Sequence, residues 1–470
     1  MNLFDKIIER VSPKLGFKRA QYRAAIEQVR SFQGASKGRR GAGFGRAGTP
    51  NSDNQRQGAT LKDRARWLYK NNSDARKAIR TIALNVVGKG IRPSFKNQGK
   101  TEQFKELWHK WADTKLCDFK RKKDFWALQF MVMRTLAIDG ECLVVRTYNS
   151  QNPYLLELHV LECDFLDNSK DTFQIESDGG FVMQGVRFDK TGRIQGYYIY
   201  DRAPENETVV KLDSEFYPAD RVLHIYDEER PGQVRGIPFL APVMMGLNDL
   251  AEYADAQLMR QKIAACFSIF VTSPQSVGGI SDTESSILAG DRVNPGTIER
   301  LAPGEEVHFG DPPGAEGYEP YVRKVQQSAA AGVGITYEQL TGDMRNVNFS
   351  SGRMGWMEAQ RQFENLQQLV IDQLCEPVFE WFIEAGKLQG LIPANAEIEA
   401  TWTPQGRFMI DPAKELKAYI LGIEKGLFSW QSVIRILGED PDSLMEEITE
   451  DKPKLEAIGI TFSNENQEDE

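Results

Sequence analysis

The sequence predicts an α+β protein in which helices come first, a sheet follows and long helices come later. Three observations support this class. The first part of the chain spaces its apolar residues as helices do, residues 142–226 hold β-rich runs separated by turn signals, and two later stretches keep the helical period over several turns. At 470 residues, 41% of them apolar, the chain can bury a large core, and its length predicts about two to four structural units.

Residues 1–60 are expected to form a flexible basic arm. Residues 31–58 are rich in Gly and in basic or polar residues and contain few aliphatic ones, a composition typical of connectors. Four basic residues there suit either nucleic-acid contact or a solvated linker: Lys37, Arg39, Arg40 and Arg46. Charged residues interrupt the apolar face of residues 1–11, which predicts a short docking helix rather than a signal peptide.

Helices and then strands are expected in the next part of the chain. Apolar spacing predicts helices over Leu61–Val87, Thr101–Cys117 and Phe125–Ala137. β-rich runs then predict strands, and the turn signal at residues 189–192 joins the third and fourth of them as a hairpin. The expected strands are Cys142–Tyr148, Leu155–Leu161, Phe181–Phe188, Arg193–Tyr200 and Val222–Tyr226.

Two long amphipathic helices are expected in the second half. Pro238 and Pro242 suit a helix start, and apolar residues then recur every three or four positions as far as Ile263, with a polar face opposite. The second helix covers Gly352–Ala385 and would be about 50 Å long at about 1.5 Å per residue. Pro377 is expected to kink it, because proline removes one intrahelical hydrogen bond.

The segments between and after these helices are shorter and more polar. Residues 273–318 are rich in Gly, Pro and Ser and contain two candidate strands, at residues 297–301 and 306–309. After Gly386 we expect short helices over Ala413–Lys425 and Trp430–Leu437. Residues 439–470 hold twelve acidic residues against two lysines, so the end of the chain is expected to be disordered or an interaction tail.

The segment GVGITYEQLTGDMRNVNFSSGRMGW, residues 332–356, is the most informative part of the chain. It reads as a short helix, an abrupt polar loop and the start of the second long helix. A stop at Gly342-Asp343 is followed by residues 344–351, half of which are Asn or Ser and favour caps and turns over helix interiors. The sequence therefore predicts a polar loop held between two helices.

Charge is divided unevenly along the chain. Residues 1–123 hold 30 Lys and Arg against 10 Asp and Glu, which gives +20, and the remainder carries −29. The acidic part is not suited to grip a duplex, because such binding depends on neutralising phosphates. The alternative explanation is that the acidity only keeps the protein soluble. Five scattered cysteines predict reduced thiols in a chain made in a cytoplasm, and no apolar run approaches the about 18 residues of a membrane span.

Catalytic and metal sites are not expected. His159 and Cys163 lie four residues apart but lack the paired spacing of structural zinc sites. The carboxylates that could serve a metal-dependent nuclease are Asp139, Glu141, Glu162 and Asp164, although Asp-Gly at a helix-to-strand corner is a common turn. No GxxxxGK[ST] phosphate loop occurs, and the histidines have no visible nucleophile partner. We therefore predict no enzyme activity, no cofactor and no metal.

Several separated segments, in order, resemble the portal proteins of tailed bacteriophages, specifically the lambda-like family. The resemblance covers Leu61 to about Gly386. The segments that carry it are LKDRARWLYKNN, NVVGKGIRP, RVLHIYDEERPGQVRGIPFLAPVM, YEQLTGD and NFSSGRMGWMEAQRQFE. It implies a portal-type fold assembled as a ring, with a wing, a long-helix stem, a small α/β clip and a helical crown.

Carried onto this chain, the resemblance assigns each part a place. Residues 1–60 are the arm and 61–236 the wing. The remaining parts are a stem helix at 237–272, the clip at 273–320, a second stem helix at 321–340, a tunnel loop at 341–354, a long wing helix at 355–386, and a crown with an acidic tail at 387–470.

The resemblance also implies a mechanical role at a unique vertex of a virion, after assembly in the host cytoplasm. A ring of twelve copies would pass double-stranded DNA during packaging and ejection, and a largely repulsive acidic wall would let the duplex slide. Arg345, Asn346, Asn348 and Phe349 of each copy would form a constriction, with Arg345 and Asn346 facing phosphates. Implied partners are the terminase large subunit at the clip, major capsid and scaffold proteins, and head-completion or tail adaptor proteins, with no membrane.

Two other functions stay open at this point. One is a metal-dependent phage DNA-processing enzyme that uses the carboxylates named above. The other is a capsid structural protein that forms no channel.

Overall fold

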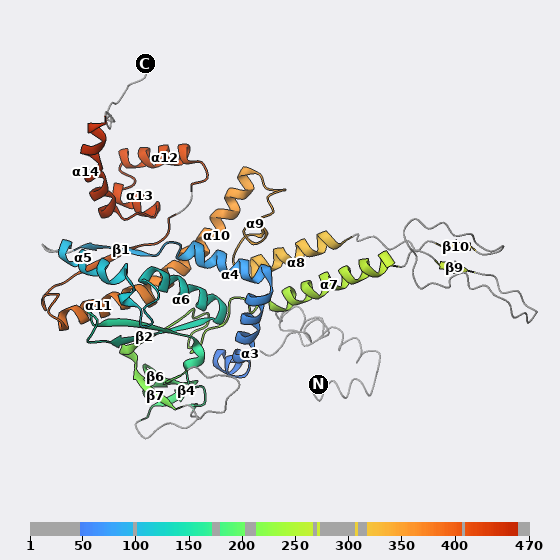
Figure 1. The fold of residues 1–470 in the computed structure, drawn as a ribbon, viewed down its shortest axis with the longest axis horizontal. Coiled ribbons are helices and arrows are strands. Elements are labelled where there is room, and N and C mark those ends of the chain that lie inside the picture. Colours follow the sequence, from blue (N-terminus) through green and yellow to red (C-terminus); the bar gives the residue numbers. More distant parts are fainter. Residues whose placement is uncertain are drawn as a thin grey trace, which may run out of the picture. The chain divides into compact units, whose positions relative to one another are not determined.

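Figure 1 shows the computed structural model of the chain. The structure describes residues 48–96, 101–171, 179–202, 213–266, 270–272, 306–308, 317–406 and 409–458. One compact unit comprises residues 1–56 and a second comprises residues 57–470; apart from the start of the first described helix, everything below concerns the second unit. Residues 1–47 of the expected arm, most of the expected clip and residues 459–470 lie outside the described residues. The described elements mix helices and sheets, which confirms the α+β class.

The first part of the described chain is helical, but its helices begin earlier and are more finely divided than expected. Residues 50–60, which were expected to belong to the flexible arm, form part of the first helix, so that boundary is wrong. The helices are α3 (Pro50–Asn71), α4 (Ser73–Val86), α5 (Thr101–Ala112) and α6 (Phe125–Asp139). The single helix expected over residues 61–87 is wrong, because the chain breaks at Asn72. Its backbone is extended and its side chain accepts a hydrogen bond from the backbone N–H of Ala75 at 3.0 Å. Asparagine favours such an N-cap over a helix interior.

The main core of the second unit lies around α4 and α6 and is rich in aromatic rings. Trp108 and Trp111 of α5 are fully buried. The ring of Trp108 lies 5.8 Å from that of Phe125 and 5.1 Å from that of Phe382, both edge-to-face. Phe382 belongs to α11 (Glu376–Leu388), so a helix from late in the chain completes a core built by early helices. Large aromatic side chains dominate such cores because each buries a large apolar area.

Two antiparallel sheets follow the helices. Among the described strands, β2 (Glu141–Tyr148) lies between β3 (Leu156–Leu161) and β8 (Val222–Tyr226). The other sheet has the order β4 (Phe181–Met183), β5 (Val186–Phe188), β6 (Ile194–Tyr200) and β7 (Ser214–Pro218). The hairpin between β5 and β6 is confirmed. The single strand expected over residues 181–188 is wrong, because Gln184 and Gly185 take positive φ and turn the chain back.

The strand β1 (Arg92–Lys96) was not expected, and its partner lies far away in the sequence. It pairs antiparallel with β11 (Glu399–Thr403), with Arg92 opposite Thr403 and Lys96 opposite Glu399. Residues 399–403 fall in the stretch that the resemblance assigns to the crown. The chain therefore returns to the early helices after α11, and the sheet joins two segments about 300 residues apart in sequence.

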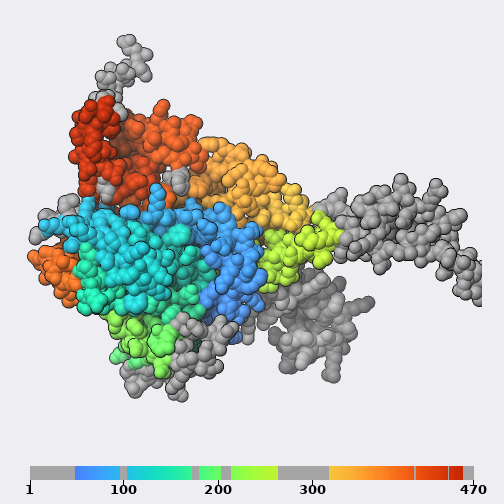
Figure 2. Space-filling model, viewed as in Figure 1, coloured from blue at the N-terminus to red at the C-terminus, as the bar shows by residue number. Residues whose placement is uncertain are grey.

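Two long helices pack against each other as a pair: α7 (Met244–Cys266) and α8 (Tyr318–Gly332). Figure 2 shows their yellow-green and yellow-orange surfaces in contact. Tyr253 of α7 lies 5.6 Å from Tyr318 and 4.7 Å from Tyr321 between ring centroids. The second stem helix expected over residues 321–340 is wrong as one helix, because α8 ends at Gly332 and a separate short helix, α9 (Tyr337–Thr341), follows.

Only a small part of the expected clip is described. Strands β9 (Phe270–Thr272) and β10 (Glu306–His308) pair antiparallel, so the strand expected at residues 306–309 is confirmed. The strand expected at residues 297–301 lies outside the described residues.

The long helix expected over residues 352–385 is confirmed, with an irregular turn in its middle. It consists of α10 (Phe349–Val370), a π-helical turn η5 (Ile371–Cys375) and α11. Pro377 has no N–H for the carbonyl of Gln373, four residues back, and the π-helical turn contains that residue. The irregular turn thus begins before the proline rather than at it.

Three helices end the described chain: α12 (Pro412–Glu424), α13 (Trp430–Ile436) and α14 (Pro441–Ala457). The first two match the expected helices. Residues 441–457 of the acidic stretch form a helix that the charge pattern did not predict. Glu446 of this helix forms an ion pair with Lys105 of α5 at 2.5 Å. At least one acidic residue of this stretch therefore has a basic partner on an early helix.

Candidate functional site

The polar loop of residues 342–348 connects α9 to α10. Thr336 and Gln339 form a capping box at the start of α9, and Gly342 ends that helix in the left-handed conformation with φ 76°. Asn348 then caps α10 by accepting a hydrogen bond from the backbone N–H of Ser351 at 2.8 Å. Both ends of the loop are therefore fixed by local hydrogen bonds.

Arg345 lies at the centre of this loop and is exposed over 71% of its side chain. Its Nε and Nη2 each donate to the Asp343 carboxylate at 2.9 Å, and Nη2 also lies 3.2 Å from Glu319 of α8. Hydrogen bonds from Arg345 hold the pKa of the Asp343 carboxyl well below its usual range. Among the described residues, Nη1 of Arg345 donates no hydrogen bond. One edge of the guanidinium is therefore available to a ligand.

A second contact joins the loop to α8 through Asn346. The side-chain oxygen of Asn346 accepts from Arg323 at 2.8 and 3.2 Å when its amide is turned to meet those donors. The Arg323 guanidinium in turn lies over the ring of Tyr337, 5.4 Å from its centroid. The loop is thus attached to α8 at two points, by an ion pair from Arg345 and by a hydrogen bond to Asn346.

All four residues predicted for the site lie on one short exposed stretch. Asn346 and Asn348 are exposed, and Phe349, the first residue of α10, is 57% exposed. Met344 and Met354 are also exposed, at 61% and 74%. The stretch is therefore an exposed run with several large apolar side chains, held at both ends by helix caps.

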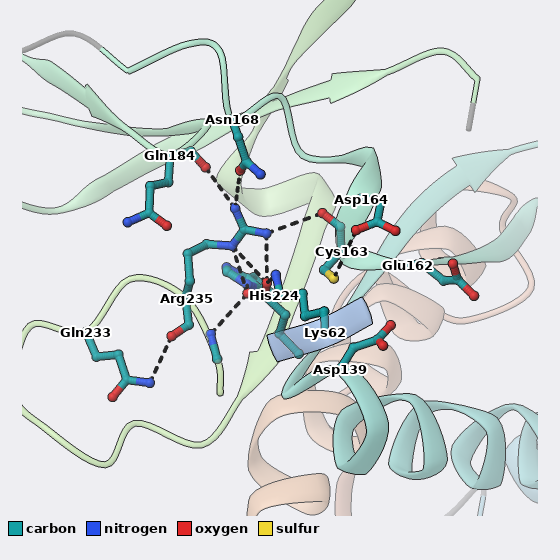
Figure 3. A network of polar contacts seen from close by, with 12 residues as sticks. Lys62, Asp139, Glu162, Cys163, Asp164, Asn168, Gln184, His224, Gln233 and Arg235 are labelled. Atoms are coloured by element: carbon teal, nitrogen blue, oxygen red, sulfur yellow. Dashed lines mark hydrogen bonds and ion pairs between the residues drawn. The ribbon is translucent and has the colours of Figure 1, made fainter. Parts of the chain in front are cut away.

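A separate buried polar network includes Lys62, His224 and Arg235, which Figure 3 labels. All three contact the carboxylate of Glu141. Glu141 at the start of β2 has no exposed side-chain surface. Its carboxylate accepts hydrogen bonds from Arg235 Nε at 2.9 Å, from Lys62 Nζ at 2.5 Å and from His224 Nε2 at 2.8 Å. Burial alone would raise the pKa of Glu141, but Arg235, Lys62 and His224 hold it well below its ordinary value. The burial of His224 lowers the pKa of its imidazole.

Two glycines bring the chain segments of this network together. Gly140, which ends α6 with φ 84°, would place a Cβ within 2.2 Å of the Ile237 backbone. Gly236 would place one within 2.0 Å of the Gly140 carbonyl oxygen. The residues next to these two glycines are Glu141 and Arg235. Close backbone contact at the glycines therefore sets the position of the ion pair.

The remaining carboxylates of the nuclease hypothesis are also occupied by basic side chains. Arg66 of α3 binds Asp139 through two hydrogen bonds of 2.8 Å and Asp164 through one of 2.5 Å, and Glu162 lies 3.8 Å away. Carboxylates that hold catalytic metal ions need free oxygens. The arrangement of cations and carboxylates here is that of a structural ion-pair network.

His159 and Cys163 do not come together as metal ligands. The His159 ring stacks on Phe119 with 4.3 Å between centroids, and Cys163 is fully buried. Burial raises the pKa of the Cys163 thiol to about 12, so it is protonated at neutral pH. Within the described part of the chain, no group of three or more His, Cys, Asp and Glu side chains is placed to hold a metal ion.

A family model described as phage portal protein, lambda family, matches residues 37–367, which is more than half of the chain. The chain belongs to this family of portal proteins. Family membership makes it a phage structural protein of the virion, at the head–tail connector. No described helix of this portal protein combines the length and apolar character that a membrane crossing needs.

Individual relatives agree with the family. The portal protein is 27% identical over 424 residues to the probable portal protein of Halomonas phage phiHAP-1, covering 85% of this chain and 81% of the relative. It is 22% identical over 454 residues to portal protein B of Escherichia phage lambda, covering 84% of each chain. A solved chain titled neck of empty GTA particle, computed with C6 symmetry, aligns with a TM-score of 0.50 and 14% identity over 82% of this chain and 94% of that chain. This last likeness concerns the fold.

The sequence located the loop but not the residues that hold it. Glu319 and Arg323 lie four positions apart on α8, a spacing that places them on one helical face, yet nothing in the sequence pairs them with the loop. The same is true of Lys62 and Arg235, which meet Glu141 from about 80 and 94 residues away. Such pairings depend on the tertiary fold.

Proposed function

We propose that copies of this chain assemble into a closed ring around a channel, and that residues 342–348 of each copy face double-stranded DNA in that channel. The observation that carries the proposal is the exposed polar loop between α9 and α10, fixed at both ends and attached to α8. A heterologous interface that closes produces such a ring, and we propose twelve copies. The account of packaging and ejection through the channel belongs to this proposal.

The described elements suggest a place for each part of the ring. The wing would comprise residues 61–236 with α10 and α11, and the β1–β11 sheet suggests that it also includes residues 399–403. α7 and α8 would form the stem, and residues 273–316, mostly outside the described part, the clip. The helices α12, α13 and α14 would form the crown. In this proposal the crown begins after residue 403 rather than at the expected residue 387.

Within the loop, Arg345 and Asn346 would meet the DNA backbone. Arg345 keeps Nη1 free for a phosphate while Asp343 and Glu319 hold its other nitrogens, and Phe349 adds an apolar surface. Contacts of this kind go to phosphates and carry no sequence information, as a moving duplex requires. Nearby carboxylates weaken the net attraction, so the duplex can slide.

The partners follow from the same role. We place a terminase large subunit at the clip, major capsid and scaffold proteins around the ring, and head-completion or tail adaptor proteins on the connector side. Assembly in the host cytoplasm belongs to this proposal, as does the mechanical role without enzyme activity.

Replacement of Arg345 and Asn346 by Ala tests the loop. We expect rings to form normally, because both side chains are exposed and contact only the loop and α8. DNA packaging or retention should fall several-fold, because the phosphate contacts are lost. The measurement is nuclease-protected DNA per assembled particle.

Arg80→Ala provides the matched control, since Arg80 is an exposed arginine on α4. It should leave the amount of protected DNA unchanged. If the Arg345 and Asn346 double variant forms rings that package and retain DNA as the unchanged protein does, the loop assignment is wrong.

A further inference from the structure

The connection between α5 and α6 contains a rigid, strongly basic turn, residues 118–124, with the sequence DFKRKKD. Asp118 is buried, and its carboxylate accepts backbone hydrogen bonds from Lys120 at 3.0 Å, Lys122 at 2.8 Å and Lys123 at 3.0 Å. One acidic side chain is thus used entirely to hold the backbone, and it leaves the lysine side chains free to project from the turn.

Most basic side chains of the turn are not neutralised by a carboxylate within the described part of the chain. Arg121 forms an ion pair with Glu157, whose side chain is almost fully buried. Among the described residues, no carboxylate forms an ion pair with Lys120, Lys122 or Lys123. Lys120 and Lys122 are exposed and Lys123 is partly exposed. Three like charges within four positions of one turn repel each other, so an anionic ligand would stabilise them.

An aromatic contact fixes the base of the turn. The Phe119 ring stacks on His159 and stays 45% exposed, and its N–H donates to the Leu158 carbonyl at 3.1 Å. Burial and the charge of Lys120 lower the pKa of His159, so that this ring is neutral at pH 7. The turn is therefore attached to β3, and its shape does not depend on a ligand.

We propose that the basic turn, residues 118–124, binds the phosphate backbone of double-stranded DNA at a place separate from the loop of residues 342–348. The backbone N–H groups that a peptide strand would need are already used by Asp118. What remains is side-chain charge without base or peptide recognition, which suits the regular phosphates of a duplex.

The charge distribution of the chain favours the same ligand. Residues 124–470 carry a net −29, so most of the surface repels DNA and a localised cluster of lysines stands out against it. The choice of DNA among polyanions rests on the proposed function, because a packaged genome is the polyanion that a portal protein meets. The existence of the site rests on the geometry of the turn alone.

The test is the triple variant Lys120→Gln, Lys122→Gln and Lys123→Gln in the full chain. Binding of a short fluorescent DNA duplex is followed by anisotropy as salt rises from about 50 to about 200 mM. We expect the slope of log K against log salt to become shallower by about 2.7, since each lost phosphate contact removes about 0.9. The turn should keep its shape, because Asp118 bonds to the backbone.

The matched control is Lys70→Gln, Lys77→Gln and Lys89→Gln, which removes the same charge from exposed positions on and after α3 and α4. It should leave the slope unchanged within about 0.5, less than the change for one phosphate contact. An equal loss in both variants would show an effect of net charge and overturn the site. Binding of polyglutamate but not of the duplex would also overturn it, in favour of an acidic protein segment.

The duplex-binding test of the basic turn can fail or succeed separately from the proposed ring and channel. Rings that assemble and package normally while the triple lysine variant binds the duplex unchanged would overturn only the basic turn. An absence of rings with intact duplex binding at residues 118–124 would overturn the proposed function and leave the basic turn standing.

Discussion

At the scale of single residues, Glu141 connects several segments of the chain. It is fully buried and meets a cation from α3, another from the segment after β8, and a histidine from β8. Arg235 also donates to the carbonyl oxygens of Gln184 at 3.2 Å and Cys163 at 3.3 Å, and so contacts the turn between β4 and β5 and the turn that follows β3. A buried carboxylate with this many partners fixes the relative position of the segments that supply them.

Replacement of Glu141 by Gln should destabilise the fold by about 3–5 kcal/mol, because it leaves Arg235 and Lys62 buried without a counter-charge. Denaturant unfolding at fixed protein concentration measures the loss. Glu162→Gln is the control: Glu162 is 65% exposed, and its distant contact with Arg66 should be worth less than about 1 kcal/mol. Equal effects of the two substitutions would contradict the structural role of Glu141.

The pH dependence of the unfolding free energy should also reveal the contribution of Glu141. The pKa of Glu141 is lowered in the folded chain from its ordinary value of 4.5, so its contribution is fully present above about pH 4.5. The contribution is lost as the pH falls from there towards the folded pKa. The difference in unfolding free energy between the unchanged protein and Glu141→Gln should therefore shrink below pH 4.5. A difference that stays constant down to pH 3 would contradict the cause assigned to the shift.

Residue by residue, the sequence predicted exposure better than pairing. The hydrogen-bonding side chains after Gly342 predicted a surface loop, and residues 344–346 and 348–350 are indeed exposed. The same reasoning left Asp139 and Glu141 open as metal ligands, although they bind Arg66 and Arg235. Spacing along the chain contains no information about a partner about 70 to 90 residues away, because only the tertiary fold brings the two together.

At the scale of elements, α8 and α10 together determine where the loop lies. α8 provides Glu319 and Arg323 as partners, and α10 begins at a residue fixed by the Asn348 cap. A shift of α8 along its axis would therefore change the contacts of Arg345 and Asn346 directly. The loop is therefore held by contacts with both helices.

Asn348→Ala should remove the N-cap of α10 and cost about 1 kcal/mol. The effect should concentrate on the first turn, with faster amide hydrogen exchange at Ser351, whose N–H bonds to the Asn348 side chain. Asn348→Asp is the matched control, since Asp also caps helices and should keep the protection. Unchanged exchange in Asn348→Ala would show that the cap does not hold the loop.

Long periodic helices were the easiest elements to predict and short connections the hardest. The apolar period revealed α7 and α10, but the break at Asn72 was missed because the same period continues across it. The strands β1 and β11 were missed for another reason: each is five residues long and is stable only as the partner of the other. Residues 441–457 form a helix although they are acidic, and Lys105 forms an ion pair with one of their carboxylates.

At the scale of the whole molecule, several exposed apolar side chains lie on α7, which we assign to the stem, and on the part of α10 that follows the loop. Met245, Leu258 and Met259 of α7 are each at least half exposed, as are Met354 and Met357 of α10. Exposed apolar surface on long helices is typical of chains that associate. This is the surface on which we expect neighbouring copies to close the ring.

Single-particle imaging of the purified full-length protein tests the central claim most directly. We predict a closed ring in which residues 342–348 of every copy line the narrowest part of a central channel wide enough for a DNA duplex. A compact monomer, or a ring in which those residues are buried between subunits away from the symmetry axis, would contradict the account.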